Sequence, residues 1–226
     1  AIFIHGEHAI VEKAVFDRDS AVNTTNKGAG GSIYVEGNDA KILGSNFTRS
    51  NAYAGGAIYV DGKNTLIDGS KFETSTSQTD GGAIYIGTTK TNSGYNTTIS
   101  NSKFKSTSAT NVGGAIYING NLANVTESTF DSTHSANQGG AIYIKGQDAS
   151  ISSSNFTSCY VNAANSDGGA IYVDGKNTNI ISSKFIKCDS VRRGGAVVLN
   201  GNNAFINGSS FEECSAVYGG ALYTAG

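Results

Sequence analysis

One five-residue motif, the phrase Gly-Gly-Ala-Ile-Tyr, recurs along the whole chain and constrains its fold more than any other feature of the sequence. Complete and degenerate copies begin at Gly30, Gly55, Gly81, Gly113, Gly139, Gly168, Gly194 and Gly219. Successive copies start 25 to 32 residues apart. A near-fixed period of this size is typical of solenoids, in which each repeat stacks on its neighbours. The sequence therefore predicts an elongated molecule whose functional surface extends over many repeats.

A second phrase, Ser-x-Phe, accompanies each glycine pair and fixes the register of the repeat. Its aromatic residues are Phe47, Phe72, Phe104, Phe130, Phe156, Phe185 and Phe211, with Phe16 in the first copy. Each repeat holds three short segments rich in β-branched and aromatic residues, all too short for helices. We expect an all-β parallel β-helix of about eight coils of 25–32 residues, with three short strands per coil. The crossover preference of parallel strands favours right-handed coiling.

The alternation of side chains within Ala-Ile-Tyr-Val predicts which residues face inward. Ile58 and Val60 share one face of the strand, and Tyr59 lies on the other. With the aliphatic face inside, stacked coils build a core of Ile, Val, Phe and small Ser ladders. The glycine pair is expected at a sharp turn, because glycine adopts positive φ at no steric cost.

Composition and charge exclude several classes of protein. The formal net charge is -2, with mixed signs and no basic run, which argues against nucleic acid as a partner. Apolar runs are far too short to cross a membrane. The chain opens at Ala1 and ends at Gly226, both within a repeat. We expect one β-helix domain over 1–226, either an uncapped segment of a longer repeat protein or a subunit that stacks on copies of itself end to end.

The tandem Gly-Gly-Ala-Ile and Phe-x-x-small phrases resemble the repeats of chlamydial polymorphic outer-membrane proteins. They are also similar to those of adhesin-like surface proteins of methanogenic archaea and of some protist repeat proteins. The resemblance implies a right-handed β-helix, exposure at the cell surface and adhesion. The chlamydial repeat prefers Asn three residues after Phe. Here that position holds Asp19, Ser50, Ser75, Thr107, Thr133, Cys159, Cys188 and Cys214, which favours a more distant surface protein.

Seven tyrosines fall in one column of the predicted outer face. They are Tyr34, Tyr59, Tyr85, Tyr117, Tyr143, Tyr172 and Tyr223, with Phe3 and Val198 at the remaining places. A row of partly exposed rings is suited to gripping glycans or proteins of a host cell or another surface. In a second interpretation the rings only stack on one another and stiffen the sheet. In a third, the column lies under a neighbouring rod as an assembly surface.

Three cysteines, Cys159, Cys188 and Cys214, each follow a Phe by three residues in consecutive coils. They are predicted to form a short stack, with spacing that a disulfide tolerates. Three thiols permit one bond and leave one thiol free. The alternative interpretation is that Cys replaces Ser or Thr at a small buried position.

Four acidic residues are candidates for catalytic or metal-binding groups. Glu36 and Asp61 hold the same turn position in adjacent coils, so their separation could approach the ~5 Å of a retaining carboxylate pair. This gives an alternative function, a polysaccharide lyase or hydrolase on a β-helix scaffold. In other coils chemically different residues occupy that position, which is typical of a solvated turn. Asp80 and Asp167 precede glycine pairs, as in calcium-binding β-rolls, but the second acidic residue of that motif is missing. We expect no enzyme, cofactor or metal site.

Six Asn-x-Ser/Thr sequons occur, at Asn23, Asn46, Asn96, Asn124, Asn155 and Asn207. A chain so rich in Asn, Ser and Thr contains about this many by chance, so their number carries no information. Asn46 and Asn155 directly precede Phe and should point outward, opposite the buried ring. The sequence therefore predicts a non-enzymatic extracellular or cell-surface protein, adhesin-like or filament-forming, with possible glycans at these positions.

Overall fold

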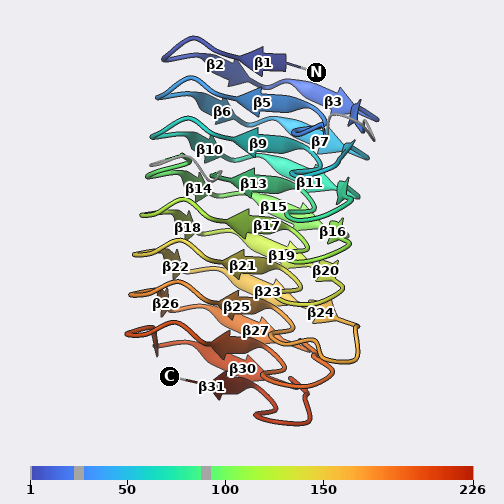
Figure 1. The fold of residues 1–226 in the computed structure, drawn as a ribbon, viewed down its shortest axis with the longest axis vertical. Coiled ribbons are helices and arrows are strands. Elements are labelled where there is room, and N and C mark those ends of the chain that lie inside the picture. Colours follow the sequence, from blue (N-terminus) through green and yellow to red (C-terminus); the bar gives the residue numbers. More distant parts are fainter. Residues whose placement is uncertain (1, 23–27, 88–92, 226) are drawn as a thin grey trace.

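The computed structural model describes residues 2–22, 28–87 and 93–225. Within these ranges every regular element is a β-strand, and the chain winds through them as a solenoid (Figure 1). Each strand pairs in parallel with its counterpart one coil along, as in Ile58 with Ile84 and Phe72 with Phe104. The predicted all-β parallel β-helix is confirmed. Its handedness stays a prediction.

Three long sheets run along the rod and correspond to the three predicted segments of each repeat. The first has nine strands: β1 (Ile2–Ile4), β5 (Ile33–Val35), β9 (Ile58–Val60), β13 (Ile84–Ile86), β17 (Ile116–Ile118), β21 (Ile142–Ile144), β25 (Ile171–Val173), β28 (Val197–Leu199) and β31 (Leu222–Thr224). The second has eight: β2 (Ile10–Glu12), β6 (Lys41–Leu43), β10 (Leu66–Asp68), β14 (Thr98–Ser100), β18 (Asn124–Thr126), β22 (Ser150–Ser152), β26 (Asn179–Ile181) and β29 (Phe205–Asn207). The third also has eight: β3 (Val15–Asp17), β7 (Asn46–Thr48), β11 (Lys71–Glu73), β15 (Lys103–Lys105), β19 (Thr129–Asp131), β23 (Asn155–Thr157), β27 (Lys184–Ile186) and β30 (Ser210–Glu212).

A fourth, narrower sheet was not expected from the sequence. Its six strands have two residues each: β4 (Ser20–Ala21), β8 (Asn51–Ala52), β12 (Thr76–Ser77), β16 (Ser108–Ala109), β20 (His134–Ser135) and β24 (Tyr160–Val161). Their residues are mostly small and polar, so local propensity does not mark them as strands. Stacking supplies the order, because each pair of residues lies beside its counterpart in the next coil.

The first glycine of each pair has the predicted turn conformation, with φ of 60° at Gly55 and 64° at Gly81. The second glycine is required for another reason. A Cβ on Gly82 would lie 2.0 Å from the carbonyl oxygen of Gly114 in the next coil, so only a residue without a side chain fits. Each of the other three corners of a coil also contains one residue with positive φ, which makes the turn. Most of these residues are not glycine, as at Asn64 (53°) and Thr74 (51°).

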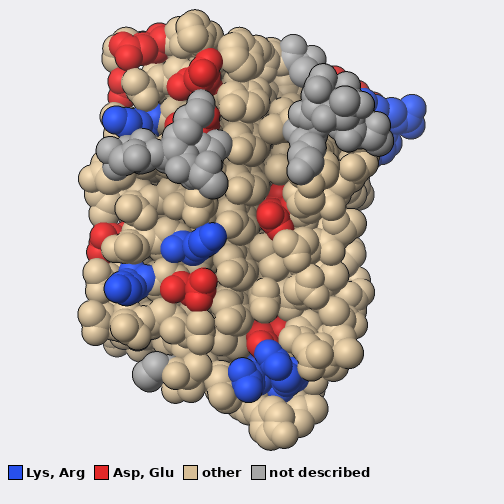
Figure 2. Space-filling view, in the orientation of Figure 1, with Lys and Arg blue, Asp and Glu red and all other residues tan. Residues whose placement is uncertain are grey.

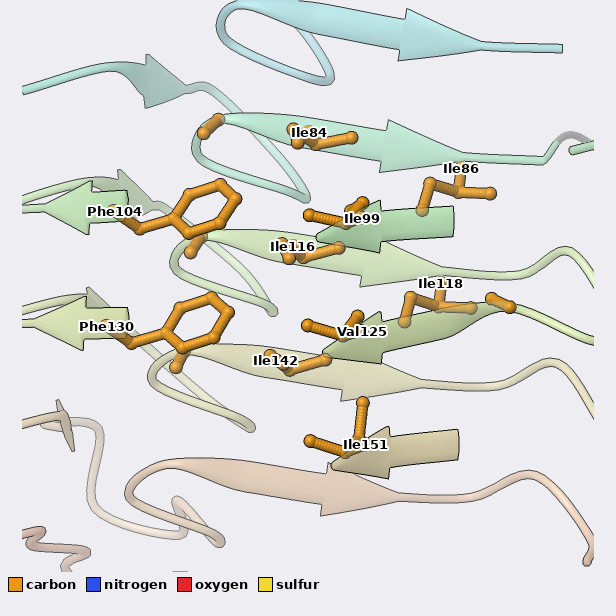
Figure 3. Packing of buried hydrophobic residues seen from close by; sticks show 14 of the residues in the cluster. Ile84, Ile86, Ile99, Phe104, Ile116, Ile118, Val125, Phe130, Ile142 and Ile151 are labelled. Atoms are coloured by element: carbon orange, nitrogen blue, oxygen red, sulfur yellow. The ribbon is translucent and has the colours of Figure 1, made fainter. Parts of the chain in front are cut away.

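The core consists of the predicted ladders of aliphatic and aromatic side chains. Figure 3 shows Ile84, Ile116 and Ile142 stacked along the first sheet. Across the core they face Ile99 of the second sheet and Phe104 of the third. Phenylalanine rings of adjacent coils stack with centroids 4.7 to 4.9 Å apart and nearly parallel planes. Since no coil buries these side chains alone, each coil depends on its neighbours for its core.

The serines of Ser-x-Phe form a hydrogen-bonded row, here called the serine ladder. Its members are Ser45, Ser70, Ser102, Ser128, Ser154, Ser183 and Ser209. The N–H of Ala14, and of each serine from Ser45 to Ser183, donates to the Oγ of the serine in the next coil, at 3.1 to 3.3 Å. Each Oγ in turn donates to the carbonyl two residues earlier in its own coil. The ladder thus pairs the serine N–H groups, while the serine carbonyls accept backbone N–H groups of the next coil, as Ser45 does from Lys71.

The first and last coils expose side chains that the middle coils bury. Ile2 of β1 and Leu222 of β31 are each 38% exposed, whereas Ile58 at the same position of β9 is fully buried. Stacking of copies on these ends stays a prediction. The described residues contain no helix long and apolar enough to span a membrane.

Candidate functional site

The seven tyrosines of the sequence prediction lie in one column on the outer face of the first sheet, hereafter the tyrosine column. Successive rings from Tyr34 to Tyr172 stack with centroids 4.5 to 5.5 Å apart. Tyr117 is only 8% exposed, and the other tyrosines of the column are half-buried. The rings therefore do stack on one another, as the second interpretation predicted, and most of them still reach the surface.

The column ends differently at Tyr223. Val198 interrupts the row of rings one coil earlier and is 2% exposed. The guanidinium of Arg193 lies over the Tyr223 ring, with its Cζ 4.9 Å from the ring centroid. A cation on a tyrosine face is an attractive contact, so this part of the outer face already holds a positively charged group.

Burial raises the pKa values of the column's phenols from Tyr34 to Tyr172. Desolvation is the largest cause and raises the pKa of Tyr34 to about 12, with a further contribution from the nearby negative charge of Asp61. The Tyr34 hydroxyl donates to Asp61 Oδ2 at 3.4 Å. Burial likewise raises the pKa values of Tyr59, Tyr117 and Tyr143. From Tyr34 to Tyr172 the column thus presents ring edges and neutral hydroxyl groups.

A second column borders the tyrosines, formed by the residue directly before each glycine pair. We call it the pre-glycine column; its members are Ala29, Ala54, Asp80, Val112, Gln138, Asp167, Arg193 and Tyr218. Most adjacent members of this column are joined by parallel β-bridges, among them Gln138 with Asp167 and Asp167 with Arg193. This column forms the wall beside the aromatic rings. Its chemistry changes from coil to coil, whereas that of the tyrosine column does not.

A cavity of about 330 Å³ opens between the two columns, and we call it the Asp80 pocket. It is lined by Ala29, Tyr53, Ala54, Tyr59, Thr79, Asp80 and Tyr85. Asp80 is half-buried, and its Oδ1 accepts a hydrogen bond from Asn111 Nδ2 at 2.7 Å. Burial raises the pKa of Asp80, and this effect outweighs the hydrogen bonds from Asn111 and the Val112 N–H, which lower it. The pocket combines a carboxylate with aromatic rings. Figure 2 shows one face of the rod, with scattered charges on a mostly uncharged surface.

A larger hollow of about 500 Å³ lies over the outer face of the third sheet. Its charged lining mixes signs, with Lys71, Lys103 and Lys105 beside Glu73 and Asp131. Most of these side chains are exposed, so the shape of the hollow depends on long side chains in water. The Asp80 pocket is the better candidate, because stacked rings and a half-buried carboxylate hold its shape.

Glu36 and Asp61, the candidate carboxylate pair, make different hydrogen bonds. Glu36 Oε2 accepts from His5 Nδ1 at 2.7 Å. Asp61 is 9% exposed and accepts from the hydroxyl groups of Tyr34 and Ser93. Among the described residues no group of three or more His, Cys, Asp or Glu side chains could hold a metal ion.

The three cysteines form the predicted stack and are free thiols. Cys159 and Cys188 are fully buried and Cys214 is half-buried. Hydrogen bonding with Cys159 is the largest cause of the raised pKa of Cys188, and hydrogen bonding with Cys188 plays the same part for Cys214. The hydroxyl of Thr133, at the same position one coil earlier, donates to Cys159 Sγ at 3.3 Å. The thiols thus continue a column of small buried hydroxyl residues.

Four of the sequon asparagines are exposed: Asn46, Asn96, Asn155 and Asn207. The outward position expected for Asn46 and Asn155 is confirmed. Asn124 is half-buried, and its Nδ2 donates to the Leu122 carbonyl at 3.2 Å. Asn23 lies outside the described residues.

Comparisons with known proteins identify no relative in sequence. No family model and no curated protein matches the chain. A solved structure found to be similar is HetL of the cyanobacterium Nostoc, a pentapeptide repeat protein involved in the regulation of heterocyst differentiation. The two share 8% sequence identity over 94% of this chain and 90% of HetL, with a TM-score of 0.28. A TM-score and a sequence identity this low carry no argument, so the fold is assigned from the strand pairing of this chain alone. The chain is a repeat protein with a parallel β-solenoid fold.

Proposed function

We propose that this chain is a non-enzymatic extracellular surface protein, adhesin-like in character, which binds its partner along the tyrosine column. One observation carries the proposal. Stacked tyrosine rings run without interruption from Tyr34 to Tyr172 on the outside of the first sheet, with the Asp80 pocket beside them. A solenoid that repeats one aromatic position over many coils presents a long binding strip rather than one deep site.

The stacked rings are suited to binding because they are already ordered. Ordering an exposed side chain on association costs about 0.5 to 1.5 kcal/mol for each flexible residue. Tyrosines held between neighbouring rings at 4.8 Å, as Tyr59 and Tyr85 are, have lost that freedom on folding. Their outward ring edges and hydroxyl groups can then contact a sugar or a protein surface at low entropic cost.

The test is binding of the purified chain to cultured cells and to an array of cell-surface glycans and immobilised surface proteins. The variant changes Tyr59 and Tyr85 to Ser, since both line the pocket and reach the surface. The matched control is Tyr160→Ser, which removes a tyrosine that is 37% exposed on the fourth sheet. We expect binding to fall at least tenfold in the double variant and to be unchanged in the control.

Equal binding by the parent chain, the double variant and the control would exclude the tyrosine column as the binding surface. Electron micrographs of the same preparation test the other predicted form, in which copies stack end to end as filaments. Rods that bind no glycan, protein or cell but assemble into filaments would replace the adhesin-like role with a structural one.

A further inference from the structure

The Asp80 pocket lies where the pre-glycine column has its smallest side chains. Ala29 and Ala54 hold this position in successive coils, are joined by a parallel β-bridge, and both line the pocket. Asp80 follows them in the next coil. Further along the column, Val112 and Gln138 carry larger side chains at the same position. The cavity of about 330 Å³ therefore opens beside two methyl groups and ends at a carboxylate.

Asp80 brings a carboxylate with unused acceptor capacity to this pocket. A carboxylate has about four positions that accept hydrogen bonds. Asn111 Nδ2 takes one of them at 2.7 Å, and the Val112 N–H takes another. The positive charge of Lys145 also acts on Asp80, although no ion pair joins the two within the described part of the chain. Because Asn111 and Lys145 already stabilise the charge, the remaining acceptor positions suit neutral donors such as hydroxyl groups.

The tyrosines of the pocket add groups of the complementary kind. Successive rings cover one another's faces, so Tyr59 and Tyr85 present their edges and hydroxyl groups. Ring edges carry partial positive charge and attract oxygen lone pairs. Desolvation is the largest cause of the raised pKa of Tyr85 and the negative charge of Asp80 is the next, so the two groups lie close together. Thr79 adds a third hydroxyl group, which donates to the Tyr53 carbonyl at 2.7 Å and can still accept.

We propose that the Asp80 pocket binds one neutral sugar ring of a glycan. Each sugar hydroxyl group is both a donor and an acceptor, so neighbouring hydroxyls can donate to Asp80 and accept from a tyrosine hydroxyl. The cavity of about 330 Å³ lies near the small end of the range for ligand pockets, about 300 to 1,000 Å³, which suits a single ring. Acidic sugars are disfavoured, because their carboxylate would lie against that of Asp80. The proposal rests on the proposed function, since it names what the tyrosine column binds.

The experiment titrates methyl glycosides into the isotope-labelled chain and follows the signals of Asp80, Ala54 and the tyrosine rings by nuclear magnetic resonance. The neutral probes are methyl β-glucoside and methyl β-galactoside, and each is paired with its uronide, which carries a carboxylate in place of the hydroxymethyl group. The better neutral probe should bind with a Kd on the order of 1 mM, because a single ring makes few contacts. Its uronide should bind at least tenfold more weakly.

Two variants test the site, one through its charge and one through its volume. Asp80→Asn removes the charge, keeps the shape of the side chain and should weaken binding at least tenfold. Ala54→Gln introduces the side chain that Gln138 carries at the same position of its own coil, and should abolish binding by filling the pocket. The control is Glu73→Gln, which removes an exposed carboxylate on the third sheet and should leave binding unchanged. Well-dispersed spectra of every variant establish that the fold is intact.

Equal binding of the neutral glycosides by Asp80→Asn and the parent chain would overturn the proposal. Tighter binding of the uronides would do the same, and so would the absence of any shift at Asp80 with either neutral probe at ten times the expected Kd. If the neutral glycosides bind at Asp80 but the chain attaches to no cell, glycan or immobilised protein, the surface function fails and the sugar site stands. If Asp80→Asn loses the glycosides yet keeps full cell binding, the surface function stands and its partner is not a sugar held in this pocket.

Discussion

Two buried serines allow a sharp test of how the coils are held together. Ser102 belongs to the serine ladder and Ser75 to the column that later holds the cysteines, and both are fully buried. The Oγ of Ser102 accepts the N–H of Ser70 at 3.2 Å and donates to the Ser100 carbonyl at 2.8 Å. The Oγ of Ser75 has no hydrogen-bond partner within the described ranges. The same substitution, Ser→Ala, should therefore act in opposite directions at the two sites.

The magnitudes follow from what each change leaves behind. Ser102→Ala leaves the buried N–H of Ser70 unpaired, which costs about 1 to 3 kcal/mol. Ser75→Ala removes a buried hydroxyl whose desolvation is uncompensated, so it should be neutral or stabilising by about 1 kcal/mol. Both changes leave the same small void, so that contribution cancels in the comparison. We expect the two variants to differ by about 3 kcal/mol, or roughly 6 to 12 °C in Tm for a chain of this size.

The assay is urea unfolding followed by circular dichroism, together with hydrogen exchange at the Ser70 amide. Ser102→Ala should lower the unfolding midpoint and speed exchange at Ser70, while Ser75→Ala should do neither. Equal destabilisation by the two substitutions would refute the reasoning, because it would mean that loss of volume, rather than loss of a hydrogen bond, sets the cost. Slow exchange at Ser70 in Ser102→Ala would show that its N–H does not depend on the ladder.

Four further outcomes are expected. Gly82→Ala should destabilise the chain by about 3 kcal/mol, because its Cβ would lie 2.0 Å from a carbonyl oxygen of the next coil. Gly69→Ala, with positive φ but no atom closer than 3.9 Å to its Cβ, should cost about 1 to 2 kcal/mol in the same unfolding assay. The folded pKa of Tyr34 is raised from 10.0 to about 12, so its contribution to stability is complete below pH ~10 and lost as the pH rises towards 12. Ultraviolet absorbance during alkaline titration should show this phenol ionising late, and ionisation near its ordinary pKa would contradict the burial argument. Hydrogen bonding with neighbouring thiols raises the pKa values of Cys188 and Cys214. Mass spectrometry should therefore find both unlabelled by iodoacetamide at neutral pH until the chain unfolds, and rapid labelling of the folded chain would disprove it.

The sequence predicts those parts of the fold that repeat in the chain with strong side-chain chemistry. Ile58 and Phe72 recur at fixed spacing, so the core ladders, the parallel pairing and the outward tyrosines all follow from the period. The fourth sheet does not, because pairs such as Ser108–Ala109 have weak strand propensity and are ordered by the coils above and below them. Positive φ at residues such as Thr74 is imposed in the same way, by a corner that every coil must turn.

The candidate site is predicted only in part, for a related reason. The tyrosine column belongs to the repeat and can be read from it. The Asp80 pocket depends on a departure from the repeat, in which Asp80 follows the small residues Ala29 and Ala54 in the pre-glycine column. These three residues lie far apart in the chain, so the pocket becomes visible only when the coils are stacked in register. A signal does exist in the sequence, in the aspartates that precede two of the glycine pairs.

The serine ladder gives the rod a direction. Every backbone N–H in that row points toward the following coil, as Ser45 does to Ser70 and Ser154 does to Ser183. The N–H of the residue after each serine points the other way, as Lys71 does to the Ser45 carbonyl. The two surfaces of a coil are consequently unlike at this corner: one offers the serine N–H and carbonyl, and the other offers the serine Oγ and the next N–H. A coil can be duplicated or deleted as a unit in this stack, but an inverted coil would not present the matching groups.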